Sequence, residues 1–174
     1  NVDLKLKKWA VREVGDDDTN PIPTFNKKKI SNMFFYSNRF GFLAEDAVIM
    51  SQAGDYFNFF QTSALTVADN DPIDVTASAE KPAMLKAALG QPQGLLLFAE
   101  NAQFMLSSEE IAFSPATVKM NEIANYFYKS SIDPIPTGSS TVFLSETSTY
   151  TKALEMLPNS AQNRALVADI TRII

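Results

Sequence analysis

The chain has 174 residues, 45% of them hydrophobic and 20% charged, which is typical of a folded globular protein and long enough to bury a sizeable core. Its formal net charge of -5 argues against nucleic-acid binding, because Lys and Arg must neutralise phosphates in complexes with nucleic acids. It contains no Cys and no His, which excludes disulfides, thiolate metal sites and every His-dependent catalytic triad.

The N-terminal part predicts a strand followed by a loop. Residues 2–13 alternate between apolar and charged side chains, which indicates an opening strand with a bulge near Lys7 and Lys8. Residues 15–23 carry three consecutive Asp and two Pro, so we expect a loop there. Because the chain begins with Asn rather than Met, we expect it to be a piece of a longer protein.

One short phrase recurs three times along the chain. It reads Phe-Leu-Ala-Glu-Asp, then Leu-Phe-Ala-Glu-Asn, then Phe-Leu-Ser-Glu-Thr, and apolar runs flank each copy. Each copy predicts a β-hairpin. The three hairpins are 40–44 with 47–52, 95–99 with 102–107, and 141–145 with 150–157. A repeat spaced by about 50 residues is typical of propeller blades or solenoid units.

In the second hairpin, both the odd-numbered and the even-numbered residues are largely apolar. Leu95 and Leu97 would point to one face of the sheet, while Leu96 and Phe98 would point to the other. A sheet with one wet face should alternate instead, so we expect both faces to be covered. Blades that pack face to face would cover them, as would the middle layer of a multi-sheet stack.

The remaining segments predict two helices and further β-structure. Apolar residues at helical spacing indicate short helices at about 80–89 and 161–174. Residues 111–128 predict one or two strands interrupted near Pro115, and residues 133–138 a Pro-rich turn. The expected fold is therefore mainly β, a partial β-propeller built from antiparallel hairpin blades. Its repeat units are about 33–60, 94–128 and 139–157, within a single segment 1–174.

Two acidic clusters invite a calcium hypothesis, because clustered carboxylates suit a hard cation. Asp16, Asp17 and Asp18 lack the spacing of an EF-hand, and a solvated loop is the favoured interpretation. The second cluster, at positions 69, 71 and 74, contains an Asp-Pro turn that ties a loop. We predict no metal ligand at either cluster.

The other charged motifs predict no chemistry. Lys27, Lys28 and Lys29 form a single basic run, which reads as a solvated loop rather than a phosphate site. Nothing places Glu109 and Glu110 across a cleft for acid/base work on a glycosidic bond. We therefore expect no enzyme, no catalytic residue and no cofactor. No apolar run approaches the roughly 20 residues of a membrane-spanning helix.

Two aromatic clusters are assigned to packing. In residues 51–60, a Ser-Gln-Ala-Gly-Asp turn precedes Phe57, Phe59 and Phe60, which we expect to fill the space between sheets. The second cluster is Tyr126, Phe127 and Tyr128. We expect these rings to be buried in the core or between subunits, and the alternative is that they form a platform for a sugar.

Several of these segments, taken in order, resemble one family. They are 9–12 with Gly15 and Asp16, 19–23, 38–43, 51–60, 71–75, 95–98 with Gln103 and Phe104, and 168–171. The ordered set, which spans about residues 9–174, is similar to the tail tubular protein B family, the tail nozzle proteins of short-tailed bacteriophages. The third hairpin departs most from a blade, with a longer tip and a polar second strand.

This resemblance implies a structural component of the virion tail. Such proteins contain a β-propeller and assemble with copies of themselves as a ring of six, below an adaptor protein, with tail fibres docked near the junction. DNA passes through the channel as cargo without specific binding. The alternative is a carbohydrate-binding or glycan-cleaving β-propeller, which would need carboxylates and aromatic platforms around a pocket.

Overall fold

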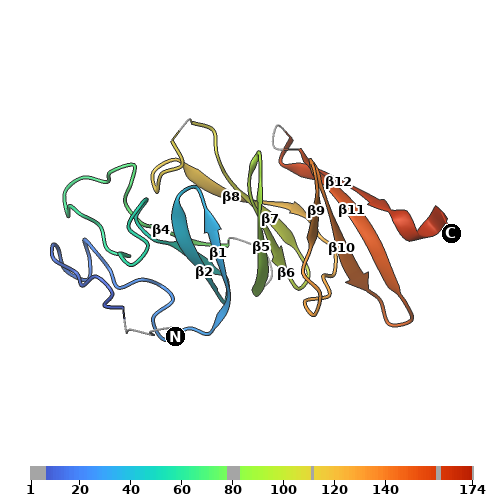
Figure 1. The fold of residues 1–174 in the computed structure, drawn as a ribbon, viewed down its shortest axis with the longest axis horizontal. Helices are drawn as coiled ribbons and strands as arrows, with labels where there is room; N and C mark the ends of the chain where they lie inside the picture. Colours follow the sequence, from blue (N-terminus) through green and yellow to red (C-terminus); the bar gives the residue numbers. More distant parts are fainter. Residues whose placement is uncertain (1–6, 78–82, 111, 160–161, 174) are drawn as a thin grey trace, which may run out of the picture.

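The computed structural model describes residues 7–77, 83–110, 112–159 and 162–173. Its described strands form three four-stranded antiparallel sheets, which confirms the mainly β prediction (Figure 1). Within each sheet, strands that are neighbours in sequence are also neighbours in space. The three sheets are therefore three successive meanders.

The bounds of the strands follow the sheets in chain order. The first sheet contains β1 (Ile30–Tyr36), β2 (Arg39–Ala44), β3 (Ala47–Met50) and β4 (Ile73–Thr76). The second contains β5 (Leu85–Gln91), β6 (Gly94–Ala99), β7 (Gln103–Ser108) and β8 (Val118–Ala124). The third contains β9 (Ile135–Thr137), β10 (Ser140–Glu146), β11 (Thr151–Asn159) and β12 (Arg164–Asp169). One turn of 3-10 helix, η2 (Ile170–Ile173), follows β12.

All three predicted hairpins are confirmed. Strands β2 and β3 pair antiparallel across Glu45 and Asp46, and Glu45 has a φ of 56° at the tip. Strands β6 and β7, and then β10 and β11, pair in the same way. A further tight turn joins β1 to β2 through Ser37 and Asn38, whose φ values of 49° and 56° suit a type I′ hairpin turn.

The second sheet is buried on both faces, as the sequence predicts. One face contributes Leu95 and Leu97 to a core shared with Leu43 and Met50 of the first sheet. The opposite face contributes Leu96 and Phe98 to a separate core that includes side chains of the third sheet. There the Phe98 and Phe143 rings lie 5.2 Å apart between centroids. The middle meander is thus a layer between two others.

The two outer faces of the stack differ. Residues 51–60 and the N-terminal loop cover much of the first sheet's outer face, where Phe42, Ile49 and Phe59 are buried. On the outer face of the third sheet, Leu157 and Leu166 pair across β11 and β12 and are 40% and 68% exposed. The stack therefore ends in a loop layer on one side and in a partly open apolar sheet on the other.

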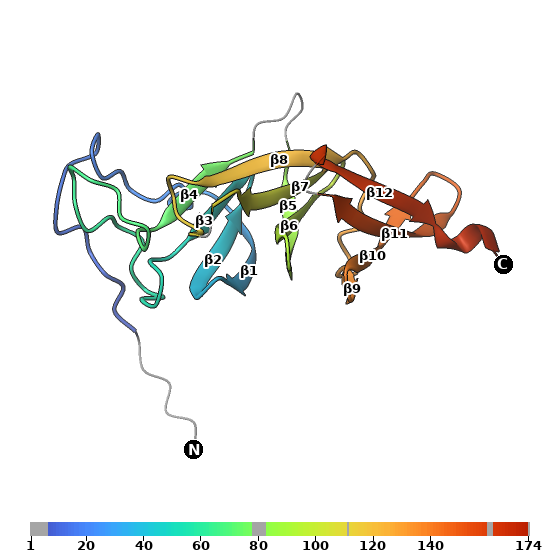
Figure 2. The ribbon, with the colours of Figure 1, turned by 90° about the horizontal axis from the view of Figure 1, so that it is seen from above.

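Both views show the three sheets in a row from the N-terminal to the C-terminal part (Figure 1, Figure 2). They form no closed barrel or propeller among the described residues. The described residues contain almost no helix, and η2 at the C-terminal end is the one helical element whose bounds are described. No helix among the described residues is long and apolar enough to cross a membrane.

Both helix predictions are wrong where the structure describes them. Residues 85–89 of the predicted helix 80–89 belong to β5, which pairs with β6 from Leu85 to Gln91 with a register shift between Leu85 and Ala87. Of the predicted helix 161–174, residues 164–169 form β12 instead, and only residues 170–173 turn as a 3-10 helix. In both cases pairing with a neighbouring strand, β6 or β11, overrides helical spacing, since β-structure depends on context more than on local pattern.

Two smaller predictions also need correction. Residues 7–13 of the opening strand 2–13 run as an irregular segment, and the residues before them lie outside the described part. This segment packs its Trp9 ring on Phe57 and Phe59 rather than joining a ladder. The Pro-rich turn at 133–138 contains a three-residue edge strand, β9, in which Pro136 is tolerated because edge strands leave N–H groups unpaired.

Candidate functional site

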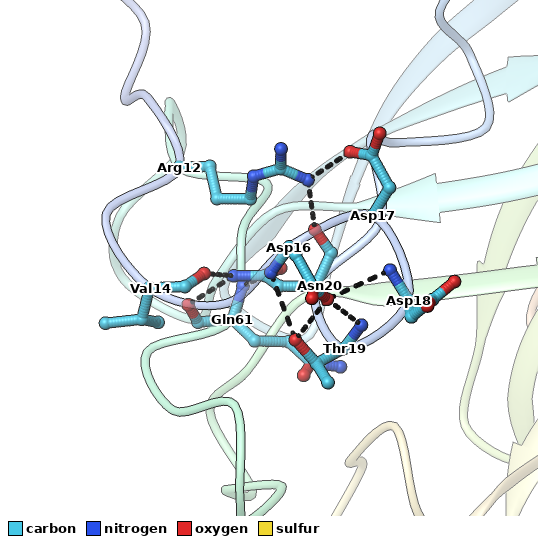
Figure 3. Close-up of polar contacts among 8 residues, drawn as sticks. All are labelled: Arg12, Val14, Asp16, Asp17, Asp18, Thr19, Asn20 and Gln61. Atoms are coloured by element: carbon cyan, nitrogen blue, oxygen red, sulfur yellow. Dashed lines mark hydrogen bonds and ion pairs between the residues drawn. The ribbon is translucent and has the colours of Figure 1, made fainter.

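The first acidic cluster forms a locked turn rather than an open carboxylate cage (Figure 3). Asp16 Oδ1 accepts hydrogen bonds from Thr19 Oγ1 at 2.9 Å, Thr19 N at 3.0 Å and Asp18 N at 3.1 Å. These donors, the Thr19 backbone N–H first, lower the pKa of Asp16. Asp17 pairs instead with Arg12 at 2.5 Å. The consecutive carboxylates thus serve different partners.

Asn20, which closes this turn, connects it to a loop far along the chain. Its side chain is 2% exposed and donates to Val14 O at 2.9 Å and to Gln61 O at 3.1 Å. Its Oδ1 accepts from Gln61 N at 3.1 Å, so Asn20 and Gln61 make a two-way amide clamp (Figure 3). Gly15 allows the approach, because a Cβ there would lie 2.7 Å from Thr19 Oγ1. The clamp fixes the N-terminal loop on the first sheet.

The second acidic cluster is also structural. Asp71 is fully buried and accepts from Thr62 N, Thr62 Oγ1 and Ala68 N, at distances between 2.8 and 3.2 Å. Asp74 Oδ2 accepts from Thr24 N at 2.7 Å. The described residues contain no group of three or more carboxylates that could hold a metal ion.

Sequence reasoning missed Arg39, the most constrained charged residue of the first sheet. It is 1% exposed and lies at the start of β2. Its guanidinium donates to five backbone carbonyls, those of Ser51, Asp69, Asn70, Asp71 and Phe113, at 2.6 to 3.4 Å. Burial lowers its pKa. The only signal in the sequence is a lone cation directly before an apolar run.

The basic run and the acidic pair have surface roles. Lys28 Nζ lies 2.9 Å from Asp46 Oδ1 at the first hairpin tip, and this hydrogen bond raises the Lys28 pKa. Glu109 lies 3.5 Å from Lys119 on an exposed surface, which gives no cleft for acid/base work. Neither motif forms a site in the structure.

The first aromatic cluster packs, as predicted, but not between two sheets. Phe59 is buried on the outer face of the first sheet, where its ring lies 5.2 Å from that of Phe25 and 5.6 Å from that of Phe42. Trp9 covers Phe57 at 5.3 Å in an edge-to-face contact. This chain of rings holds the loop layer on the sheet.

The second aromatic cluster divides between core and surface. Tyr128 is buried in the core between the second and third sheets, and its burial together with Asp133 raises its pKa to about 12. Tyr126 and Phe127 are 39% and 67% exposed and line a cleft of about 740 Å³. The cleft lies between the segment after β8 and the third sheet, and its lining is of mixed polarity.

Comparison with known proteins identifies the family. A family model described as "Bacteriophage nozzle protein" matches residues 1–174. The chain is 35% identical over 151 residues to the "Tail tubular protein gp12" of Escherichia phage T7. That match covers 87% of this chain but 19% of the relative, so the chain spans about a fifth of that protein's length. The family predicted from the sequence is confirmed: the chain belongs to the bacteriophage nozzle proteins and is a structural component of the virion tail.

Proposed function

We propose that this chain forms three consecutive blades of a β-propeller in a phage tail nozzle that conducts DNA during ejection. The observation that carries the proposal is the stacking of three successive four-stranded meanders, with the middle one buried on both faces. Propeller blades are four-stranded antiparallel meanders that pack in this way. The repeat units predicted at about 33–60, 94–128 and 139–157 each correspond to part of one blade.

The outer face of the third sheet supports continuation of the stack. Because side chains alternate along a strand, Val142 and Leu144 point away from the second sheet, on the same side as Leu157 and Leu166. A propeller normally needs four or more blades to close. The relative from phage T7 extends well beyond the matched segment, so a longer nozzle protein has chain to supply further blades.

In this proposal the role is mechanical, with no catalytic step. Copies of the protein close a ring of six by heterologous contacts, and the adaptor protein and tail fibres dock on that ring. The net charge of -5 supports a conduit that does not retain the genome, because affinity for DNA comes chiefly from cations that neutralise phosphates. DNA is then passing cargo rather than a bound ligand.

Electron microscopy of the purified nozzle protein that contains this chain tests the proposal. We expect closed rings of six copies, with a propeller in which these three sheets are adjacent blades. Isolated monomers, or sheets that end in solvent without a fourth blade, would contradict it. Gel-shift titration with double-stranded DNA should show no saturable complex at physiological salt.

A further inference from the structure

The cleft beside Tyr126 has no role in the proposed ring, yet it is built from several elements. It is about 740 Å³ in volume and opens between the segment after β8 and the side of the third sheet that faces the second. Its lining combines exposed aromatic rings with charged groups, namely Tyr126, Phe127, Tyr150, Lys152, Asp169 and Arg172. Such a mixture is typical of a ligand site rather than of a packing defect.

Three aromatic side chains present ring surface at this cleft. Tyr126, Phe127 and Tyr150 are 39%, 67% and 56% exposed. The hydrogen bonds that Tyr126 and Tyr150 make within the described residues use their backbone atoms. Lys152 Nζ lies over the Tyr150 ring, 5.3 Å from its centroid. Exposed rings that converge on one cleft offer flat apolar platforms with polar ends.

The backbone that carries Tyr126 is held rigidly by a buried side chain. Gln103 is fully buried in β7, and its amide donates to Tyr126 O at 2.8 Å and accepts from Tyr126 N at 3.2 Å. Next along the chain, Tyr128 N donates to Glu100 O at 3.0 Å and Lys129 N donates to Leu144 O at 2.8 Å. The backbone that carries Tyr126 and Phe127 is thereby tied to the second and third sheets, which lowers the entropy cost of ordering it when a ligand binds.

The charges at the cleft favour an anionic ligand. Lys152 Nζ lies 3.4 Å from Asp169 Oδ2, and the Thr171 hydroxyl and Lys152 lower the pKa of Asp169, which keeps it ionised. Arg172 also lines the cleft. Two cations against one carboxylate leave one excess positive charge, in a chain whose net charge is -5. This local reversal of sign attracts carboxylates.

We propose that this cleft binds an acidic saccharide of the uronate type. The C–H faces of the sugar rings would pack on Tyr126, Phe127 and Tyr150, and Arg172 and Lys152 would hold the carboxylate. Double-stranded DNA does not fit this chemistry, because its base faces are stacked and cannot reach the aromatic rings. The proposal adds a binding function to the structural role and does not depend on ring formation.

Calorimetric titration of the nozzle protein that contains this chain tests the site, with hexagalacturonate as probe and maltohexaose as the uncharged control. We expect saturable binding of hexagalacturonate, about tenfold tighter than that of maltohexaose. Tyr126→Ala and Tyr150→Ala should each weaken binding about tenfold. Arg172→Gln should weaken the binding of hexagalacturonate but leave the affinity for maltohexaose unchanged. Tyr56→Ala and Lys119→Gln, which remove a tyrosine and a lysine far from the cleft, should change neither affinity.

Each remaining outcome of this titration counts against the proposal. Absence of saturable binding would overturn it, as would equal affinities for the two sugars or cleft variants that bind like the wild type. Tighter binding of single-stranded oligonucleotide would assign the cleft to nucleic acid. Thermal melting verifies that each variant folds, and Phe127→Ala, at a side chain that is 67% exposed, replaces any tyrosine variant that does not. Ring formation is measured separately by microscopy, so a loss of sugar binding and a loss of assembly are distinguishable.

Discussion

Arg39 holds the first sheet, the loop before β4 and the connection before β8 together with one side chain. Its partners are five backbone carbonyls, which lose the guanidinium donor if the side chain is removed. Among the loop contacts of the described residues, only the Asn70 carbonyl has a further donor, Ala53 N at 3.0 Å. An unpaired buried carbonyl costs free energy, because it has given up water without regaining a hydrogen bond. The buried guanidinium therefore holds several loop carbonyls at one point, as a bound metal ion does in other loop clusters.

We predict that Arg39→Ala lowers the free energy of unfolding by about 3 to 5 kcal/mol. Arg39→Lys should recover only part of this loss, because an ammonium group cannot span the same fork of acceptors. Urea denaturation measures both variants. Arg164→Ala, at an exposed position, is the matched control and should stay within about 0.5 kcal/mol of the wild type. An unchanged midpoint for Arg39→Ala would show that the carbonyls find other donors.

Asp16 gives a second residue-scale prediction, on pH. Its folded pKa is depressed below the ordinary value of 3.8, so ionised Asp16 contributes stability above that pH and loses it as the pH falls through the folded pKa. Asp16→Asn should therefore be less stable than the wild type at neutral pH, and the difference should shrink below pH 3.8. Urea midpoints at a series of pH values measure this. A difference that is constant down to acid pH would exclude the carboxylate charge as its cause.

At the scale of elements, the sequence predicted the strands and hairpins whose apolar residues alternate locally. It missed the features that depend on contacts with distant strands. The three hairpins were predictable because their apolar runs and tips are local, and the two-sided burial of β6 followed from its parity. Strand β5 was mistaken for a helix because Leu85 and Leu89 are also four residues apart, and only pairing with β6 decides between the two. The cleft at Tyr126 was not predictable, since the backbone of Tyr126 is held by the side chain of Gln103, which belongs to another strand.

The layered arrangement of the second sheet predicts equal sensitivity on its two faces. Leu97→Ala and Phe98→Ala each leave a cavity in a different core, so both should cost about 3 to 5 kcal/mol. In a sheet with one wet face, only one of two adjacent positions would matter. Chemical denaturation of the two variants measures this, with Leu166→Ala on β12 as a control that should cost well under about 1 kcal/mol. A large asymmetry between positions 97 and 98 would contradict the stack.

At the scale of the whole molecule, one outer face of the stack of sheets is largely covered and the other is partly exposed. The loop layer with its chain of aromatic rings covers much of the first sheet, whereas the third sheet leaves Leu157 and Leu166 partly open. An exposed apolar sheet face next to an edge strand favours association with another sheet. In a propeller, that sheet is a further blade of the same protein. In non-specific aggregation, it belongs to another chain.

Leu166→Lys separates these two possibilities. In the chain of residues 1–174, the substitution should leave the free energy of unfolding within about 0.5 kcal/mol, because the side chain is 68% exposed, and it should reduce self-association. In the longer nozzle protein, where the proposal places another blade on this face, the same change should bury a charge and lower stability by several kcal/mol. Sedimentation and thermal melting of both proteins measure the two effects. Leu65→Lys, at a loop position that is 95% exposed, is the control and should be neutral in both. If Leu166→Lys is equally neutral in the longer protein, no blade covers this face and the propeller proposal fails.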